Sequence, residues 1–209
     1  MRKAIEKNAR LLATFAVVCT ALVGLVNLLT KDHIVLQEQQ QLLTTLSGII
    51  AKERHDNDIY LDCLLINNED LSDKTQKAYL ARLNNAPIAA AVTSTAPDGY
   101  SGNIELLVAI NYDGSVSGVR TIKHQETPGL GDKIELNKSN WILSFSNKRI
   151  LDDVDSRWAV SKDGGMFDQF TGATITPRAV VSAVKKTVNF FNKNKQQLFA
   201  QKANCQETT

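Results

Sequence analysis

The feature that most constrains this chain is an uncharged apolar run near its N-terminus, Leu11 to Leu29 (LLATFAVVCTALVGLVNLL). Its length is close to the roughly 20 residues that a helix needs to cross a bilayer. Four basic residues precede it, whereas Lys31 and Asp32 follow it and cancel in charge. The positive-inside rule therefore predicts a single transmembrane helix at 11–29, a cytoplasmic N-terminus at 1–10, and a main domain on the opposite side, in the periplasm of a Gram-negative cell.

Two other interpretations of the apolar run are disfavoured. A cleaved signal peptide needs small residues before its cleavage site, but this run ends in Val26-Asn27-Leu28-Leu29-Thr30. A lipid-modified Cys19 also needs a small residue before it, and Val17-Val18 occupies that place. We therefore expect the segment to remain as an anchor in contact with membrane lipid.

Composition limits what the rest of the chain does. The 209 residues suffice for the anchor and one domain with its own core. The 24 basic and 22 acidic residues give a net charge of +2, without the dense basic stretch that nucleic-acid binding requires. Three scattered histidines and the cysteines Cys19, Cys63 and Cys205 lack metal-site spacing, so no metal is predicted. The sequence leaves open whether Cys63 and Cys205 form a disulfide.

Hydrophobic periodicity predicts the elements of an α+β domain. Leucines and isoleucines at helical spacing indicate an amphipathic helix over 34–54, within a juxtamembrane segment at 30–55. A helix is predicted over 72–83 and strands over 60–66, 88–92 and 158–160. Two β-rich runs, 104–110 and 116–122, flank an Asp-Gly turn and predict a hairpin in a mostly antiparallel sheet.

The C-terminal third supplies the remaining expectations. After Pro177, apolar residues at helical spacing predict a helix packed on the sheet: Val180, Val181, Val184, Val188 and Phe191. Trp141 and Trp158 are expected in the core. The acidic cluster of Asp152, Asp153 and Asp155 indicates a solvated turn, because it lacks the alternation of a calcium loop. The domain is predicted over 56–202, followed by a flexible polar tail at 203–209.

One stretch, Asp168-Gln169-Phe170-Thr171-Gly172-Ala173-Thr174-Ile175-Thr176-Pro177, combines small residues with a helix start. Gly172 and Ala173 allow close approach to a ligand, and Pro177 suits the first helical position with Thr176 as its cap. A phosphate near Thr174 would meet free N–H groups and partial positive charge. As a bare pattern, the same stretch is a turn with an N-cap.

A second stretch, 124–133 (HQETPGLGDK), is a glycine-punctuated loop directly after the predicted hairpin. Such loops build pockets when a rigid sheet positions them. Without further information it is equally well a plain connection.

Together these motifs carry a family resemblance. D-x-x-T-G-A-T at 168–174 is similar to the site at which flavin transferases join FMN to the last threonine. With G-Y-x-G at 99–102 and E-T-P-G-L-G at 126–131, it resembles the FMN-binding domain of two respiratory complexes. These are the Rnf-type (Rsx) ion-translocating complex, through its G subunit, and the sodium-pumping NADH:quinone oxidoreductase, through its C subunit. The N-terminal anchor and the chain length resemble the Rnf G subunit, and the resemblance covers nearly the whole chain.

The resemblance implies a set of site residues. Thr174 would carry FMN covalently through a phosphoester, and Asp168, Thr171, Gly172 and Ala173 would complete the recognition motif. The pocket would be formed by Glu126, Thr127, Gly129, Leu130, Gly131 and Lys133. In that pocket we expect Leu130 over a ring face, the Gly129 and Gly131 amides on ring carbonyls, and Lys133 beside the reduced flavin. No residue is expected to be catalytic in turnover.

The implied function is electron transfer within an ion-translocating complex of the inner membrane. Its partners would be the other Rnf or Rsx subunits and a flavin transferase, and in enteric bacteria the complex would keep a redox-sensing regulator reduced. The uncharged anchor places the ion path in other subunits. The alternatives are a membrane-tethered binding or sensory module without covalent flavin, and a flavoenzyme acting alone. The second lacks a G-x-G-x-x-G nicotinamide fingerprint.

Overall fold

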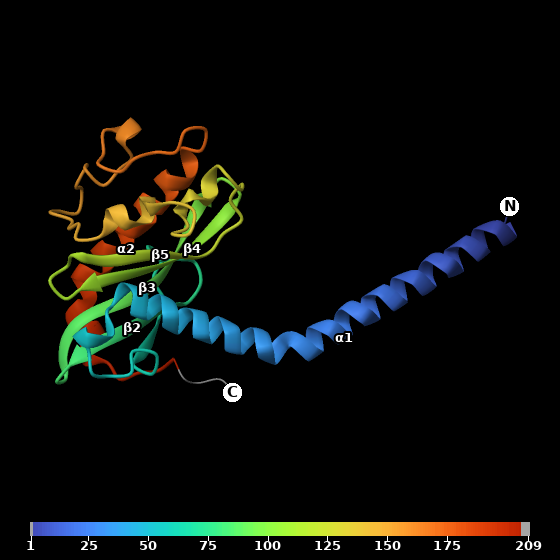
Figure 1. Ribbon diagram of the computed structural model, residues 1–209, viewed down its shortest axis with the longest axis horizontal. Helices are drawn as coiled ribbons and strands as arrows, with labels where there is room; N and C mark the ends of the chain where they lie inside the picture. The colour runs from blue at the N-terminus through green and yellow to red at the C-terminus, as the bar shows by residue number, and fades with distance from the viewer. Residues whose placement is uncertain (1, 206–209) are drawn as a thin grey trace. The chain divides into compact units, whose positions relative to one another are not determined.

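The computed structural model describes residues 2–205, which fall into two compact units divided between Thr44 and Thr45. The first unit is the larger part of α1 (Arg2–Ile49), a long helix coloured blue in Figure 1. Within it, Ile5–Lys31 has a mean hydropathy of 2.3 and is long and apolar enough to cross a membrane. The predicted span at 11–29 lies inside this segment.

The last turn of α1 belongs to the second unit. Leu46, Ile49 and Ile50 are buried there, and the Ser117 hydroxyl donates to the Ile49 carbonyl oxygen at 2.6 Å. The sequence predicted a separate helix over 34–54, but the structure has one helix that continues from the apolar span and ends at Ile49. An extended residue, Ala51, then leads into the short 3-10 helix η1 (Lys52–Arg54).

The second unit is built on a five-stranded antiparallel sheet (Figure 1). Its strands are β1 (Cys63–Ile66), β2 (Gln76–Leu83), β3 (Ala86–Gly99), β4 (Gly102–Asn111) and β5 (Val116–Lys123). Their spatial order equals their order along the chain, so every neighbouring pair is a hairpin or a short connection. The predicted hairpin of 104–110 with 116–122 is confirmed as β4 and β5.

Turn residues explain two of these hairpins. Asn84 and Asn85 join β2 to β3 with positive φ angles of 50° and 66°, a conformation that asparagine tolerates better than most residues. Gly114 joins β4 to β5 with φ 88°, where a side chain would be strained. The predicted strand at 88–92 is the middle of β3, and that at 60–66 is present as β1 alone.

The helix α2 (Ile175–Ala200) packs on the sheet, chiefly on β3. All five residues predicted to form its packing face are buried. They join the inward side chains of the strands in one hydrophobic core. Since α2 begins immediately after the Thr-Gly-Ala-Thr stretch, this packing fixes where that stretch lies.

The predicted helix at 72–83 is wrong. Residues 76–83 form β2, which pairs with β1 on one side and β3 on the other. The side chains of Ala78, Tyr79, Leu80 and Ala81 are all buried, so both faces of the strand are covered. Pairing and burial of this kind override the helical propensity of alanine, leucine, lysine and glutamine.

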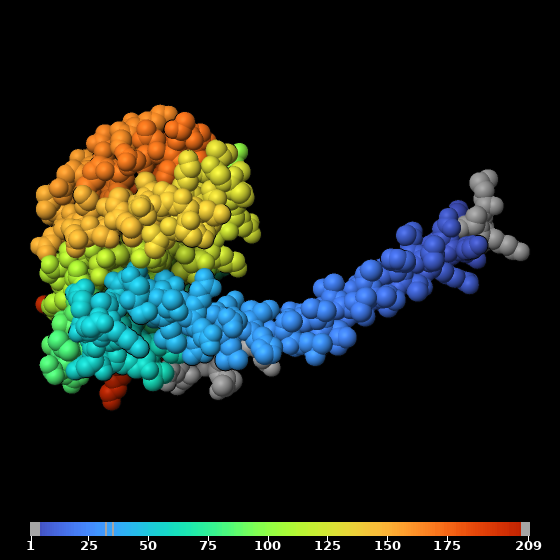
Figure 2. All heavy atoms as spheres, viewed as in Figure 1, coloured from blue at the N-terminus to red at the C-terminus, as the bar shows by residue number. Residues whose placement is uncertain are grey.

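The segment between β5 and α2 forms one end of the domain, yellow to orange in Figure 2. It contains three 3-10 helices, η2 (Gly131–Ile134), η3 (Asn140–Phe145) and η4 (Ser161–Asp163). Trp141 and Trp158 are buried among phenylalanines, as the sequence predicted. The predicted strand at 158–160 is wrong, because Val160 makes a single bridge to Phe167 and a tight loop separates the two residues.

In the acidic turn, Asp152 and Asp153 are exposed as predicted, whereas Asp155 is buried. Its carboxylate accepts hydrogen bonds from the Leu151 and Arg157 amides and from the Arg157 guanidinium. The guanidinium holds the pKa of the Asp155 carboxyl well below its usual range. Lys185 on α2 donates to the Asp155 carbonyl oxygen at 2.7 Å. The turn is therefore connected to α2 by a hydrogen bond.

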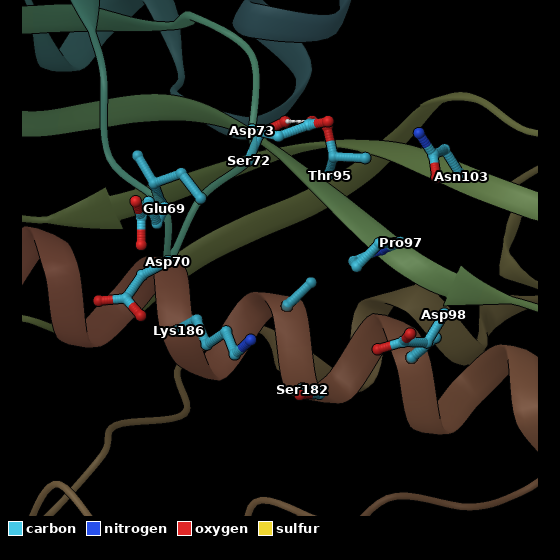
Figure 3. A pocket seen from close by; sticks show the side chains of 13 residues that line it. Glu69, Asp70, Ser72, Asp73, Thr95, Pro97, Asp98, Asn103, Ser182 and Lys186 are labelled. Atoms are coloured by element: carbon cyan, nitrogen blue, oxygen red, sulfur yellow. Dashed lines mark hydrogen bonds between the residues drawn. The ribbon is translucent and has the colours of Figure 1, made fainter.

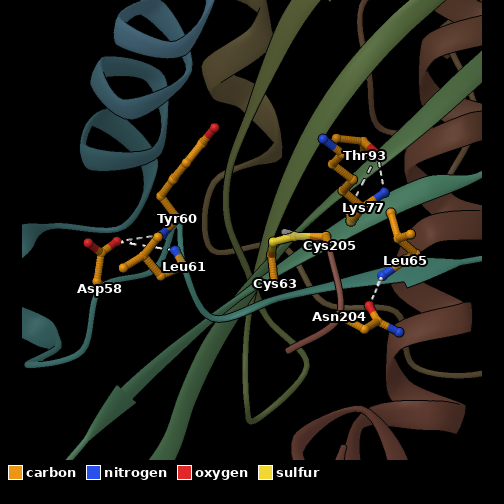
Figure 4. The surroundings of a disulfide bond; sticks show 9 residues. All are labelled: Asp58, Tyr60, Leu61, Cys63, Leu65, Lys77, Thr93, Asn204 and Cys205. Atoms are coloured by element: carbon orange, nitrogen blue, oxygen red, sulfur yellow. Dashed lines mark hydrogen bonds between the residues drawn. A yellow bond between two sulfur atoms is a disulfide. The ribbon is translucent and has the colours of Figure 1, made fainter. Parts of the chain in front are cut away.

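A disulfide joins Cys63 on β1 to Cys205, with the Cα atoms 5.6 Å apart (Figure 4). Asn204 reinforces the connection, because its amide donates to the Cys63 carbonyl oxygen at 2.9 Å and its side-chain oxygen accepts from the Leu65 amide at 2.7 Å. Of the predicted tail at 203–209, Asn204 and Cys205 are thus held against the edge of the sheet. Residues 206–209 lie outside the described residues.

Candidate functional site

The two sequence motifs meet at one pocket of about 300 Å³. It lies between the loop after β5, the start of α2 and the β3–β4 turn. Ten residues line it: Tyr100, Glu126, Thr127, Leu130, Gly131, Gly172, Ala173, Thr174, Ile175 and Thr176. The volume is at the lower end of the range for small-molecule sites, so a large ligand would extend beyond it.

Glu126 is a buried carboxylate in this pocket, with 5% of its surface exposed. One carboxylate oxygen accepts from the Ser101 amide at 3.0 Å, and the other accepts from the Thr176 hydroxyl. These bonds come from the β3–β4 turn and the first turn of α2. A buried carboxylate held in this way fixes three segments relative to one another, because leaving it unpaired would be costly.

Glycine at position 131 is required by space. A Cβ atom there would lie 2.7 Å from Glu126 Oε2 and 2.9 Å from Thr176 Oγ1. On the other wall, Gly172 has φ 82°, so its backbone also favours glycine. The same Gly172 faces Leu130, whose side chain would contact a Cβ at 3.7 Å. Gly131 therefore lets the Glu126 and Thr176 side chains approach the loop, and Gly172 provides a backbone conformation that other residues rarely adopt.

Thr174 stands at the N-terminus of α2. The sequence predicted Thr176 as the cap and Pro177 as the first helical residue, but the helix begins at Ile175 and Thr174 is the N-cap residue. Pro177 falls in the first turn, where its missing N–H costs no helical hydrogen bond. The Thr174 side chain makes no capping hydrogen bond. Thr174 therefore lines the pocket beside the positive end of a 26-residue helix, with its side chain not used for capping.

Four predicted site residues lie outside the pocket lining: Gly129, Lys133, Asp168 and Thr171. Asp168 and Thr171 are exposed, and the Asp168 carbonyl oxygen accepts from the Trp141 indole N–H at 2.8 Å. The Lys133 ammonium lies 6.0 Å from the centre of the Phe170 ring. These residues hold the motif in place or lie beside it, and none of them lines the pocket.

Some backbone N–H groups of the glycine loop already make hydrogen bonds within the loop. The amides of Leu130 and Gly131 both donate to the Thr127 carbonyl oxygen at 3.1 Å. The Gly131 amide is therefore used inside the loop, contrary to the expectation that it would bind a ring carbonyl. Gly129 has φ 78°, which makes this tight turn possible.

The sequence analysis missed three lining residues, Tyr100, Ile175 and Thr176. Tyr100 and Ile175 are exposed large side chains at the pocket. Pairing of Gly99 with Gly102 makes the tight turn that presents Tyr100. The sequence did contain a signal for Tyr100, namely an aromatic residue between two glycines at a hairpin turn. A side chain at such a turn lies outside the hydrophobic core.

A second pocket of about 330 Å³ lies between the 69–73 loop, the end of β3 and α2 (Figure 3). Its polar lining includes Glu69, Asp70, Asp73, Asp98 and Lys186. None of the predicted site residues lies in it. Within residues 2–205, no group of three or more histidine, cysteine, aspartate or glutamate residues is arranged to hold a metal ion.

Comparison with known families defines the class. The model of the FMN-binding domain matches residues 99–189, which include every residue lining the first pocket. A model of the RnfG N-terminal region matches residues 1–49, which correspond to α1. The chain therefore combines an FMN-binding domain with the N-terminal region of a membrane-complex component.

Relatives with closely similar sequences extend over the full chain. A protein of Shewanella loihica is 52% identical over 208 residues, covering 99% of this chain and 98% of the relative. Proteins of Vibrio atlanticus and Vibrio cholerae are 50% and 51% identical over 206 and 207 residues, covering 98–99% of this chain and 99% of each relative. Each of the three is named as the G subunit of an ion-translocating oxidoreductase complex. The chain belongs to this family of G subunits.

The residues of the pocket fit FMN. Glycine at position 131 leaves room for the Glu126 and Thr176 side chains, which keeps these polar groups in the pocket lining. Leu130 and Ile175 offer apolar surface, and the start of α2 offers N–H groups and positive potential for a phosphate.

Proposed function

We propose that this protein carries FMN covalently on Thr174 and relays electrons within its complex. The observation that carries the proposal is the position of Thr174, which lines the pocket at the N-terminus of α2 and makes no capping hydrogen bond with its side chain. A phosphate on this oxygen would lie where helix N–H groups stabilise negative charge. Bound FMN would supply the redox chemistry, and the chain would supply its position and surroundings.

Attachment requires a second protein, a flavin transferase that uses FAD. The Thr174 oxygen would form a bond to the phosphorus of the FMN half, the phosphoanhydride bond to AMP would break, and the hydroxyl proton would pass to a base. No electrons are exchanged in this step. Asp168 and Thr171 are exposed and lie outside the pocket lining, which suits residues that the transferase reads from outside. Gly172 and Ala173 would let the transferase approach the backbone.

The pocket residues then have distinct roles toward the ring. Leu130 and Ile175 would shield it from water, and Tyr100 would border its exposed side. Thr127 and Glu126 supply polar groups within the lining. Lys133 lies at the border, so it would act on the reduced flavin through its charge at longer range.

We place the domain in the periplasm, with the N-terminus in the cytoplasm and 11–29 in the inner membrane. Basic residues before the span favour this orientation. The Cys63–Cys205 disulfide supports it independently, because disulfides persist in oxidising compartments such as the bacterial periplasm. With an uncharged span, the ion path would belong to other subunits of the complex, and reduction of a redox-sensing regulator would be a downstream role.

Replacing Thr174 tests the attachment. In cells that produce a flavin transferase, we expect Thr174→Val to give folded, membrane-bound protein without covalent flavin. Thr174→Ser is the matched control, because it keeps an oxygen nucleophile at the same place, and it should retain flavin. In-gel flavin fluorescence and intact mass measure the result, and peptide mapping locates the adduct. Fluorescence that persists in Thr174→Val, or wild-type protein without the adduct, would support the binding-module alternative or a different site.

A further inference from the structure

A histidine outside the pocket lining holds the loop that forms one pocket wall. His124 lies directly after β5, and its side chain is 12% exposed. Its Nε2 atom lies 2.8 Å from Glu135 Oε1, and its Nδ1 atom lies 3.1 Å from the Glu126 backbone nitrogen. The imidazole therefore contacts both ends of the loop that contains Leu130 and Gly131.

These two contacts define the protonation of the ring. A backbone N–H is a donor, so Nδ1 must be the unprotonated acceptor of the Glu126 amide. In the neutral ring the proton then lies on Nε2, which donates to the Glu135 carboxylate. The structure thus selects one of the two neutral tautomers, and a proton on Nδ1 would face another donor.

The histidine is connected to the pocket through Glu126. The Glu126 amide is fixed by His124, and the carboxylate is fixed by the Ser101 amide and the Thr176 hydroxyl. A parallel bond from the Thr121 hydroxyl to the Ile134 carbonyl oxygen, 3.1 Å long, ties β5 to η2 at the base of the loop. The position of the Glu126 carboxylate in the pocket therefore depends on His124, which does not line the pocket.

We propose that His124 is a positioning residue for the cofactor pocket, acting through the Glu126 amide. This inference rests on the proposed function, because the property that Glu126 would set is the reduction potential of the bound flavin. A carboxylate held near a flavin disfavours the addition of electrons, because the added negative charge is repelled. Without the His124 acceptor only the Ser101 and Thr176 bonds hold Glu126, so the carboxylate shifts relative to the ring and the flavin potential becomes more positive.

Two substitutions separate the two contacts. His124→Asn places an amide oxygen near the position of Nδ1, so it keeps the acceptor for Glu126 and loses the contact with Glu135. His124→Gln reaches the position of Nε2, so it keeps the contact with Glu135 and loses the acceptor. The flavin-carrying full-length protein in detergent is titrated spectroelectrochemically for each variant, and thermal unfolding records its stability.

We expect the potential of His124→Asn to stay close to wild type and that of His124→Gln to become more positive. Equal potentials and flavin spectra in wild type and His124→Gln would overturn the proposal. So would equal shifts in both variants, which would mean that the Glu126 amide bond is not responsible. A general loss of packing lowers stability in both variants without distinguishing them, so the difference between the two potentials is the decisive quantity.

A second measurement needs no bound flavin. Long-range proton–nitrogen NMR of histidine-labelled protein reports the tautomer of each of the three histidines, and comparison with His124→Asn assigns the signal. We expect the proton on Nε2 of His124, and a proton on Nδ1 would overturn the inference. If wild-type protein proves to lack covalent flavin, the proposed function fails, whereas this measurement still decides whether His124 holds the Glu126 amide.

Discussion

The Thr176 hydroxyl donates a hydrogen bond to the Glu126 carboxylate, although the two residues are 50 positions apart in sequence. Each belongs to a different motif, so this contact is where the loop after β5 meets the start of α2. Both residues are buried, and the carboxylate accepts a further bond from Ser101. The pocket therefore depends on polar contacts that cross between segments.

Replacing Thr176 measures this contact. Thr176→Val keeps the shape and removes the donor, so Glu126 is left with an unpaired buried oxygen, at a cost of about 1–3 kcal/mol in the free energy of unfolding. Thr187→Val is the control, because Thr187 is equally buried on α2 but donates to the Ala183 carbonyl oxygen within the helix. Urea unfolding in detergent should show the larger loss for Thr176→Val. Equal losses would mean that the Glu126 contact contributes nothing specific.

The Gly131 position gives a steric prediction. In Gly131→Ala the new Cβ would approach Glu126 and Thr176 within 2.9 Å, so the loop must shift and covalent flavin loading should fall. Gly129→Ala is the comparison, since a Cβ there meets nothing within 4 Å and the cost is backbone strain at φ 78°. Loading is measured by in-gel fluorescence. A larger loss in Gly129→Ala than in Gly131→Ala would contradict the close packing inferred at Gly131.

The disulfide predicts a dependence of stability on redox conditions. Cys63 and Cys205 are 142 residues apart, so the bond restricts a long loop in the unfolded chain. Reduction should lower the free energy of unfolding by roughly 2–5 kcal/mol. Urea unfolding with and without reductant measures this difference, and the Cys63→Ser/Cys205→Ser double variant should not respond to reductant. A response of the double variant equal to that of wild type would exclude the disulfide as the cause.

Because Tyr79 is buried, we expect the protein to lose stability at alkaline pH. Burial raises the pKa of Tyr79 to about 12, with a smaller contribution from the stacked Tyr60. The folded protein keeps a proton that the unfolded chain releases near pH 10, so stability is full below that pH and falls as the pH rises toward 12. The difference in unfolding free energy between wild type and Tyr79→Phe should change across this window. Tyr100→Phe, an exposed control, should leave the profile of wild type unchanged.

Local sequence patterns predicted a long apolar helix near the N-terminus, the β4–β5 hairpin and α2, because each depends on nearby residues. They failed for β2, whose composition favours a helix and whose strand conformation comes from pairing on both sides. They also failed at Asp155, since burial of that carboxylate depends on Arg157 and on the Leu151 amide closing a tight loop. Such contacts follow from tertiary structure and leave no periodic signal.

At the site, the family resemblance identified most of the pocket, and the structure adds how its parts are held. The motif residues Asp168 and Thr171 form one unit with Thr174 in sequence, yet they lie outside the pocket lining. Conversely, Tyr100 and Thr176 enter it from a hairpin turn and a helix start. The geometry thus separates the motif residues that line the pocket from those that do not.

The bond between Cys63 and Cys205 has a consequence for biogenesis. Cys205 follows all five strands and α2, whereas Cys63 opens the first strand. The cross-link therefore cannot form during synthesis of the sheet and must wait until the final helix has emerged. Oxidation would thus report that the chain has been synthesised through α2, and chains that stop before α2 would keep a free thiol on their first strand.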